Sequence, residues 1–144
     1  MKAFSVDDLH LHHKVMDLHG RPGCANVFGT VRSVDRQANG YTSRIWRFPA
    51  DGGYPRPLTH GPGSDSSPRL SPDAASLAFI SDRGKSRQLY VIQLDGGEAR
   101  QVAEFELGVS DFRWGADGKT LLVSPESRTR LNEMAFLVRR ACRN

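Results

Sequence analysis

Ser110 is the residue of this 144-residue chain that comes nearest to the setting of an activated nucleophile. A serine at a strained strand-to-helix turn needs the pattern Gly-x-Ser-x-Gly, because the backbone approaches closely on both sides of the serine. Here the segment reads Gly108-Val109-Ser110-Asp111-Phe112, so the second glycine is missing. We therefore assign no catalytic residue to this sequence.

A cluster of histidines near the N-terminus is the second feature with chemical potential. It comprises His10, His12, His13 and His19. On a helix, side chains share a face at spacings of three or four residues, which only His10 and His13 have among the first three. No cysteine or carboxylate completes a tetrahedral set beside them. We expect exposed or packing histidines, no metal site and no cofactor, although weak binding of copper or nickel in vitro stays open.

The carboxylates do not form an acid–base pair in the sequence. Asp7, Asp8, Asp17 and Asp35 stand singly in leader and loop settings, which favours a solvated surface. Asp51-Gly52-Gly53 and Asp95-Gly96-Gly97 resemble phosphate-binding loops only superficially, since no P-loop lysine or following helix accompanies them. Glycine adopts positive φ at low cost, so both segments predict hairpin turns.

These two Asp-Gly-Gly turns also mark an internal repeat of 44 residues. Ser71-Pro72-Asp73 returns in degraded form as Gly115-Ala116-Asp117 at the same spacing. A period of about 40–45 residues made of short strands is the size of one β-propeller blade, and a closed propeller needs roughly four to eight of them. The pairs in register are Ile45 with Leu89, Trp46 with Tyr90, Arg56 with Arg100, Leu58 with Val102, Arg69 with Arg113, Leu77 with Leu121, and Phe79 with Val123.

The fold class that follows is all-β: an incomplete β-propeller of about two to three four-stranded blades, with short helices at both ends. Trp46, Tyr90 and Trp114 fall on its strands, and we expect them to pack between blades. The last unit should expose an unpaired strand and an apolar face. The sequence divides into three predicted parts. The first is a helical leader at 1–20, with a helix at Phe4–Val15 and Ser5 as its N-cap. The second is a partial propeller at 21–124, with blades at 24–60, 66–103 and 109–124, and the third is a basic tail at 125–144 whose apolar residues have helical spacing.

Composition narrows the function classes. The chain is 38% hydrophobic and 25% charged, as in a globular protein, and no apolar run approaches the roughly 18 residues of a membrane helix. Residues 1–18 are charged where a signal peptide would be apolar, so we expect a cytoplasmic protein. Five arginines and two glutamates from Pro125 onward supply +3 of the net +4. The repeat region is thus nearly neutral, which argues against nucleic-acid binding. Cys24 and Cys142 suggest two unrelated thiols.

Three segments carry a resemblance to a known family. They are Ser-Ser-Pro-Arg-Leu-Ser-Pro-Asp (66–73), Leu-Ala-Phe-Ile-Ser-Asp-Arg-Gly (77–84) and Gln-Leu-Tyr-Val-Ile-Gln-Leu-Asp-Gly-Gly-Glu-Ala-Arg-Gln-Val (88–102). They resemble the WD40-like repeats of the prolyl oligopeptidase family of serine peptidases, in particular its acylaminoacyl-peptidase and dipeptidyl-peptidase-like branch. The leader at 4–9 and the segments at 31–36 and 43–46 are similar to the start of that branch, so the resemblance covers about residues 4–124. The sequence departs from the family at Arg21-Pro22-Gly23-Cys24, where the family has a Ser-Pro-Asp-Gly turn, and at Ala74, where it has glycine.

The resemblance implies a propeller that filters access to the active site of a peptidase. The family's catalytic serine, aspartate and histidine lie in a separate α/β-hydrolase domain, so this chain alone should not hydrolyse peptides. Two alternatives remain: a propeller module that binds peptides or proteins on its own, and a scaffold like the Tol-type propellers, which share the repeat. The expected partners are peptides or further copies of the chain at exposed blade edges, with neither nucleic acid nor membrane.

Overall fold

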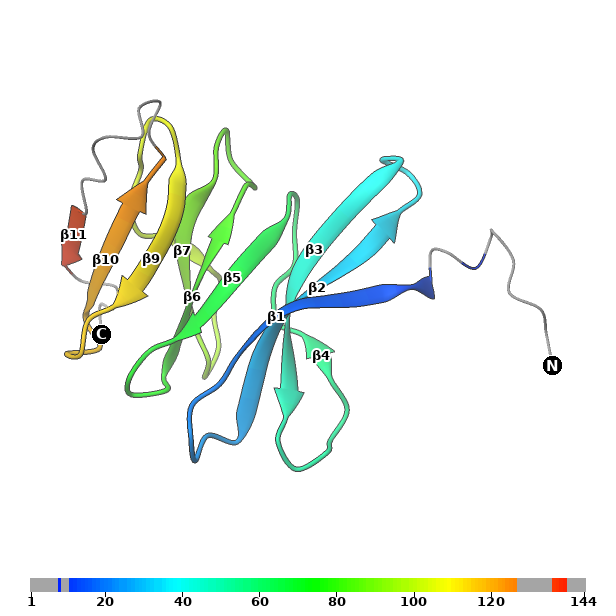
Figure 1. Cartoon of the computed structure of the whole chain (residues 1–144), viewed down its shortest axis with the longest axis horizontal. Helices are drawn as coiled ribbons and strands as arrows, with labels where there is room; N and C mark the ends of the chain where they lie inside the picture. The colour runs from blue at the N-terminus through cyan, green and yellow to red at the C-terminus, as the bar shows by residue number, and fades with distance from the viewer. Residues whose placement is uncertain (1–7, 9–10, 127–135, 140–144) are drawn as a thin grey trace.

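The computed structural model describes residue 8, residues 11–126 and the backbone of residues 136–139. These residues form three antiparallel sheets, one after another along the chain, and no α-helix occurs among them. Figure 1 shows the three sheets side by side, with the second sheet between the other two. This arrangement of consecutive meandering sheets confirms the predicted incomplete β-propeller.

The first sheet has the strand order β1-β2-β3-β4. Its centre is a long hairpin in which the pairing runs from Asn26↔Pro49 to Asp35↔Gly40. The carboxylate of Asp35 closes this hairpin, because its Oδ1 accepts the backbone N–H groups of Gln37 and Ala38 at 3.0 and 3.1 Å. The strands are β1 (His13–His19), β2 (Asn26–Asp35), β3 (Gly40–Pro49) and β4 (Arg56–Pro57).

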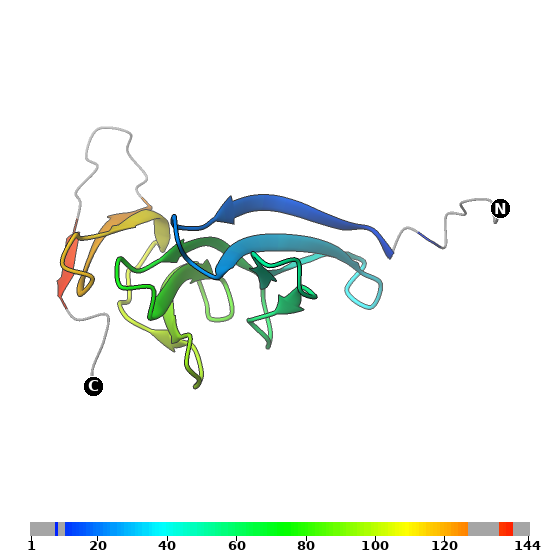
Figure 2. The same cartoon turned by 90° about the horizontal axis from the view of Figure 1, so that it is seen from below.

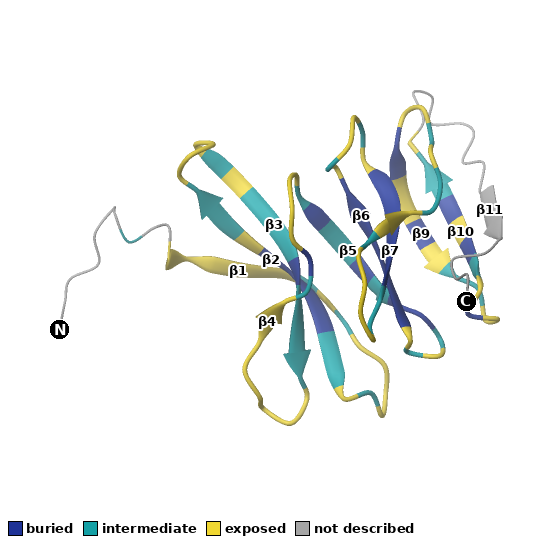
Figure 3. Ribbon diagram, turned by 180° about the vertical axis from the view of Figure 1, so that it is seen from behind, coloured by how far each residue is buried: buried dark blue, intermediate teal, exposed yellow. Residues whose placement is uncertain are grey.

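The second sheet has the order β5-β6-β7-β8 and is the most deeply buried (Figure 3). All six residues of β6 are buried, because its alternate side chains enter two different cores. Leu77 and Phe79 face the first sheet, whereas Ala78 and Ile80 face the third. The strands are β5 (Asp65–Leu70), β6 (Ser76–Ser81), β7 (Gln88–Gln93) and β8 (Arg100–Gln101).

The third sheet has the order β11-β10-β9. Its inner hairpin turns at Asp117, whose Oδ1 accepts the N–H groups of Lys119 and Thr120 at 3.0 and 2.9 Å. The backbone of β11 then pairs with β10 from Thr120↔Arg139 to Val123↔Phe136. The strands are β9 (Val109–Trp114), β10 (Thr120–Pro125) and β11 (Phe136–Arg139).

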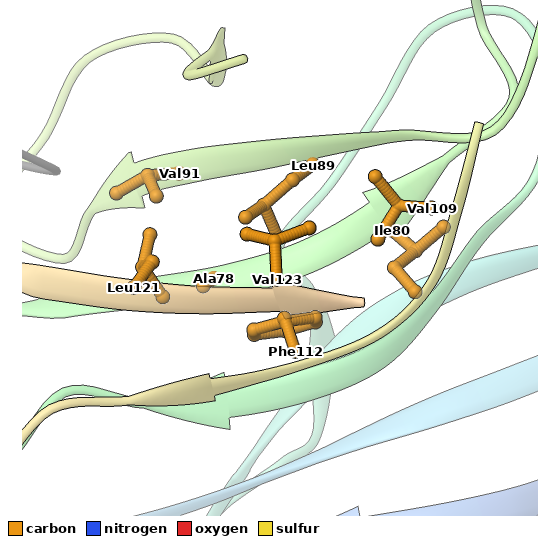
Figure 4. Close-up of a cluster of buried hydrophobic side chains, with 8 residues drawn as sticks. All are labelled: Ala78, Ile80, Leu89, Val91, Val109, Phe112, Leu121 and Val123. Atoms are coloured by element: carbon orange, nitrogen blue, oxygen red, sulfur yellow. The ribbon is translucent and has the colours of Figure 1, made fainter. Parts of the chain in front are cut away.

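Two apolar clusters hold the sheets together. The first interface, between the first and second sheets, contains Phe28, Ile45, Leu70, Leu77, Phe79, Tyr90 and Ile92. The second interface, between the second and third sheets, contains Ala78, Ile80, Leu89, Val91, Val109, Phe112, Leu121 and Val123 (Figure 4). In Figure 4 the side chains of the two sheets interdigitate, as expected when adjacent blades pack face to face.

The 44-residue register corresponds to equivalent positions in successive sheets. Ile45 on β3 and Leu89 on β7 are both fully buried. Leu77 on β6 and Leu121 on β10 are likewise both fully buried. Leu77 belongs to the first interface and Leu121 to the second, so each sheet presents the repeated residue to the sheet before it.

The predicted helices are wrong where the structure places strands in the same segments. His13–Val15, the end of the predicted N-terminal helix, begin β1, and Phe136–Arg139 within the predicted tail helix form β11. In both places pairing with a neighbouring strand overrides the local helical signals. Of the rest of the predicted N-terminal helix the structure describes Asp8, Leu11 and His12, of which Asp8 and Leu11 have 3₁₀ geometry; residues 4–7 and 9–10, and residues 127–135 and 140–144 of the tail, lie outside the described residues. Figure 2 shows β1 as a long strand along one side of the molecule.

No helix in the described part of the chain is long and apolar enough to cross a membrane.

Candidate functional site

Ser110 lies inside strand β9 rather than at a strand-to-helix turn. Its hydroxyl group donates a hydrogen bond to the backbone oxygen of Ser124 on the neighbouring strand at 3.0 Å. Gly108, just before the strand, has φ of +98°, and a Cβ there would lie 2.8 Å from the backbone oxygen of Arg87. That glycine therefore permits a close approach of two loops and does not frame a nucleophile.

The histidines of the N-terminal cluster do not converge in the described part of the chain. His13 and His19 stand at opposite ends of β1, and His10 lies outside the described residues. The His13 ring lies 6.1 Å from that of Trp46, in a tilted arrangement. Burial, followed by the charges of Arg69, Arg21 and Arg113, lowers the pKa of His19 below 6.5. Among the described residues no three His, Cys, Asp or Glu side chains gather in a metal-binding group.

Asp17, Asp35 and Asp51 accept hydrogen bonds from backbone N–H groups. Asp17 on β1 accepts the N–H of Thr30 at 3.1 Å, and Asp51 accepts that of Gly53 at 2.9 Å. Asp35 closes the β2–β3 hairpin as described above, Asp8 lies in the leader, and Asp7 is outside the described residues. The Asp-Gly-Gly segments are turns between β3 and β4 and between β7 and β8, with φ of +86° at Gly52 and +105° at Gly97.

The repeat-related aromatic residues take part in packing. The Tyr90 ring stacks on Phe79 in the first interface, with the ring centroids 6.0 Å apart. Trp114 packs against the second interface, and its indole N–H donates to the backbone oxygen of Arg69 at 2.8 Å. This bond links β9 to β5, the corresponding strand of the sheet before it. Cys24 is a half-buried free thiol beside the first interface, and Cys142 lies outside the described residues.

A buried charge pair, which the sequence analysis missed, crosses the end of the second sheet. Asp65 at the start of β5 is fully buried and accepts a hydrogen bond from the Arg83 guanidinium at 2.9 Å. The guanidinium also lies 4.9 Å from the centre of the Tyr90 ring, and its Nε donates to the Ser81 hydroxyl at 2.8 Å. The Ser-Asp-Arg-Gly segment was a signal of the family resemblance, but nothing in the sequence identified Asp65 as its partner.

Arg83 also lines a pocket of about 400 Å³ at the outer part of the first interface. The other walls include Leu58, Thr59, Ile92 and Glu98. Two of the polar groups that bound this pocket have partners within the protein: Arg83 binds Asp65, and the Thr59 hydroxyl accepts the N–H of Ile45 at 3.0 Å.

A second pocket, of about 250 Å³, lies where the first sheet meets β5. We call it the Thr30 pocket. Its lining combines a carboxylate, a guanidinium and three hydroxyl groups. The residues that line it are Met16, Asp17, Thr30, Arg32, Ser43 and Ser66.

Comparison with known proteins assigns this architecture. No family model matches the chain. The chain is 37% identical over 124 residues to the uncharacterized peptidase YuxL of Bacillus subtilis, which covers 85% of this chain and 19% of that protein. It is 43% identical over 58 residues to the Tol-Pal system protein TolB of Bordetella pertussis, covering 40% of this chain and 13% of TolB. The chain thus spans no more than about a fifth of these relatives.

Solved structures agree on the fold. The acylaminoacyl peptidase of Pyrococcus horikoshii superposes with a TM-score of 0.68 and 23% identity, over 88% of this chain and 19% of that one. The β-propeller domain of the Trilobed protease from Pyrococcus furiosus gives a TM-score of 0.63 and 18% identity, over 77% of this chain and 33% of that domain. The resemblance carried by the repeats is thereby confirmed, and the described residues are blades of a β-propeller similar to those of prolyl-oligopeptidase-family peptidases.

Proposed function

We propose that the chain supplies the first blades of a peptidase propeller, which limits the size of the peptides that reach a hydrolase domain outside these 144 residues. The similarity to YuxL carries the proposal, because it extends over 124 residues and 85% of this chain. The similarity to TolB spans 58 residues only. Cleavage would then depend on a serine, aspartate and histidine that this chain does not supply.

The coding sequence downstream of the Ser124 codon, read in all frames, tests this proposal. We expect further blades, a Gly-x-Ser-x-Gly segment and later aspartate and histidine residues in triad order. A stop codon with no such frame beyond it would overturn the peptidase assignment.

Activity measurements provide a second test. The purified chain should not hydrolyse acyl-amino-acid or dipeptidyl chromogenic substrates, because no nucleophile elbow is present in it. Turnover that persists after host peptidases have been removed would contradict the proposal. A cytoplasmic location belongs to the same proposal, and recovery of the protein in a periplasmic or secreted fraction would overturn that part.

The second candidate is a stand-alone interaction module, favoured by the TolB similarity at 43% identity. It predicts stable complexes with folded proteins rather than with short peptides. Affinity capture with the intact chain, followed by reconstitution from purified components, separates the two functions. A stoichiometric complex with one folded partner, combined with no downstream hydrolase frame, would favour the module.

A further inference from the structure

We propose that the Thr30 pocket binds a small zwitterion, an α-amino acid or a dipeptide, through one carboxylate-binding and one ammonium-binding side. This inference rests on the proposed function, because amino acids and dipeptides are the molecules that peptide hydrolysis releases. The pocket, of about 250 Å³, lies between β1, β2 and β3 of the first sheet and β5 of the second. It is separate from the Asp65–Arg83 pair and its neighbouring pocket.

A buried hydroxyl group without a protein partner points into this region. Thr30 is 3% exposed, and its Oγ1 has no hydrogen-bond partner in the described part of the chain. Thr30 pairs with Ile45 in the first sheet, just as Ile80 pairs with Leu89 in the second. The repeat therefore has isoleucine where Thr30 stands. A hydroxyl group in place of an apolar side chain weakens the interface unless something binds it.

The walls of the pocket carry one charge of each sign. Asp17 uses Oδ1 to accept the Thr30 N–H, and Arg32 places its guanidinium 4.8 Å from the centre of the Tyr41 ring. Within the described residues, neither side chain forms an ion pair with the other or with a third residue. A simple anion would be repelled by Asp17, whereas a zwitterion matches both charges. Arginine suits the carboxylate, because its guanidinium can donate two parallel hydrogen bonds.

Both strands that border the pocket are irregular beside it. The β1–β2 register shifts between Val15 and Asp17, so Met16 is an extra residue. The β5–β6 register shifts between Ser66 and Arg69, and Ser67 has φ of +56°. Bulges re-aim side chains, and a left-handed residue other than glycine is uncommon. The regular sheet is thus interrupted on both sides of the same pocket, and this opens space beside Thr30.

Calorimetric titration of the whole chain with alanine and with alanyl-alanine tests the proposal. We expect saturable binding of at least one of them, and their comparison shows whether the amino acid or the dipeptide is preferred. N-acetyl-alanyl-alanine lacks the ammonium group and alanyl-alanine amide lacks the carboxylate. Each blocked ligand should bind at least about tenfold more weakly. Equal affinity for blocked and free ligands, or no saturable binding at millimolar concentration, would overturn the proposal.

Variants assign the two sides of the pocket. Arg32→Gln should abolish the preference for the carboxylate over the amide and leave the preference for the free ammonium group. Asp17→Asn keeps an oxygen to accept the Thr30 N–H and should do the reverse. Arg56→Gln removes an exposed arginine of β4 and is the matched control, which should bind as the parent does. Identical behaviour of all three variants would place the binding elsewhere and overturn the assignment.

Thr30→Val tests the role of the hydroxyl group in a variant that is expected to fold normally. It removes the hydroxyl group with little change in shape, so the melting temperature should stay the same or rise while affinity falls about threefold or more. Unchanged affinity would overturn the role of Thr30. These results do not depend on the downstream reading frame. Selective binding without a downstream hydrolase frame would support the ligand site and overturn the peptidase proposal. A hydrolase frame without selective binding would support the peptidase proposal and overturn the ligand site.

Discussion

At the end of the second sheet, the Arg83 side chain contacts polar groups and aromatic rings at the same time. It contacts the buried Asp65 carboxylate, the Ser81 hydroxyl and the faces of Phe79 and Tyr90. A guanidinium can do all of this at once because it is planar, holds its charge and has donors in a fixed plane. The Ser-Asp-Arg-Gly segment, which follows β6, therefore holds the start of β5 in place through the contact of Arg83 with Asp65.

Loss of Arg83 should be costly. Arg83→Met leaves the fully buried Asp65 carboxylate without its partner, and we expect the free energy of unfolding to fall by about 3–5 kcal/mol. Arg87→Met is the control, because the Arg87–Glu126 pair is 3.5 Å apart with side chains 49% and 42% exposed. It should cost less than about 1 kcal/mol. Urea unfolding measures both values, and similar losses would contradict the structural role of Arg83.

His19 gives the stability a pH dependence near neutrality. Burial and three nearby arginines lower its pKa in the folded state below 6.5, so the folded protein binds a proton less readily than the unfolded chain does. The stability is therefore complete above pH 6.5 and declines as the pH falls through 6.5 toward the lowered pKa. His19→Gln should flatten this part of the curve, as measured by melting temperature against pH. An unchanged slope in the variant would assign the dependence to another group.

Carboxylates affect the stability of the fold at lower pH than His19 does. Hydrogen bonds from the Ser71 hydroxyl and the Ala75 N–H lower the pKa of Asp73 below 3.8. Bonds from Thr120 and Lys119 do the same for the exposed Asp117. The turn stability that these groups provide is present above their ordinary pKa and is lost only as the pH falls below about 3.8. The His19 effect can therefore be observed separately.

Among the elements, β1 depends on a close approach to β2 at Gly29. A Cβ at this position would lie 2.6 Å from Leu18 Cδ2 and 2.8 Å from the backbone oxygen of Asp17. Gly29→Ala should therefore push β1 away and lower the free energy of unfolding by about 1–3 kcal/mol. Gly40→Ala, at the start of β3, meets only the Ala38 oxygen at 3.7 Å and should change it by less than about 1 kcal/mol.

Chemical denaturation of the two glycine variants separates local crowding from a general effect of adding a methyl group. Equal stabilities would show that β1 adjusts without cost. Protection of the Leu18 and Thr30 amides from hydrogen exchange gives a second measurement, which should fall in Gly29→Ala alone because the β1–β2 pairing is what it disturbs.

Strands closed by nearby turns could be predicted from the sequence, and strands paired over long distances could not. The sequence alone indicates β6 (Ser76–Ser81), because Pro72 and Asp73 form the turn before it and apolar and polar residues alternate within it. β1 was mistaken for part of a helix because only its pairing with Val31, Thr30 and Gly29 reveals a strand. The Thr30 pocket was missed for the same reason, since its walls come from β1, β2, β3 and β5.

For the molecule as a whole, the exposed apolar side chains of the described strands are concentrated at one end. The first sheet exposes Val15, Met16 and Leu18 on β1, at 46%, 49% and 61%. On the strands of the third sheet, the described side chains include a single large exposed apolar residue, Leu122, beside the exposed Arg113–Asp111 ion pair. The exposed apolar surface of the first sheet is thus additional to the one expected at the last unit, which stays a prediction.

Self-association of the isolated chain should accordingly proceed through β1. Leu18→Lys adds a charge to this surface and should lower the weight-average mass at high protein concentration, as measured by light scattering. Leu122→Lys, the control at the other end, should leave the mass unchanged. A chain that is monomeric at every concentration, or a mass that responds to Leu122→Lys alone, would contradict this prediction.

The hydrogen-bond ladders each stay within one sheet, and the sheets meet chiefly through side chains. A protease that cuts the connection at residues 58–64 or at 102–108 would therefore sever the chain without breaking any sheet. The resulting pieces should remain together through Phe79, Tyr90 and the Trp114–Arg69 bond, and should separate only in denaturant. Such fragments, produced separately, would reassemble into the native arrangement, so the sheet is the smallest unit in which this fold can be divided.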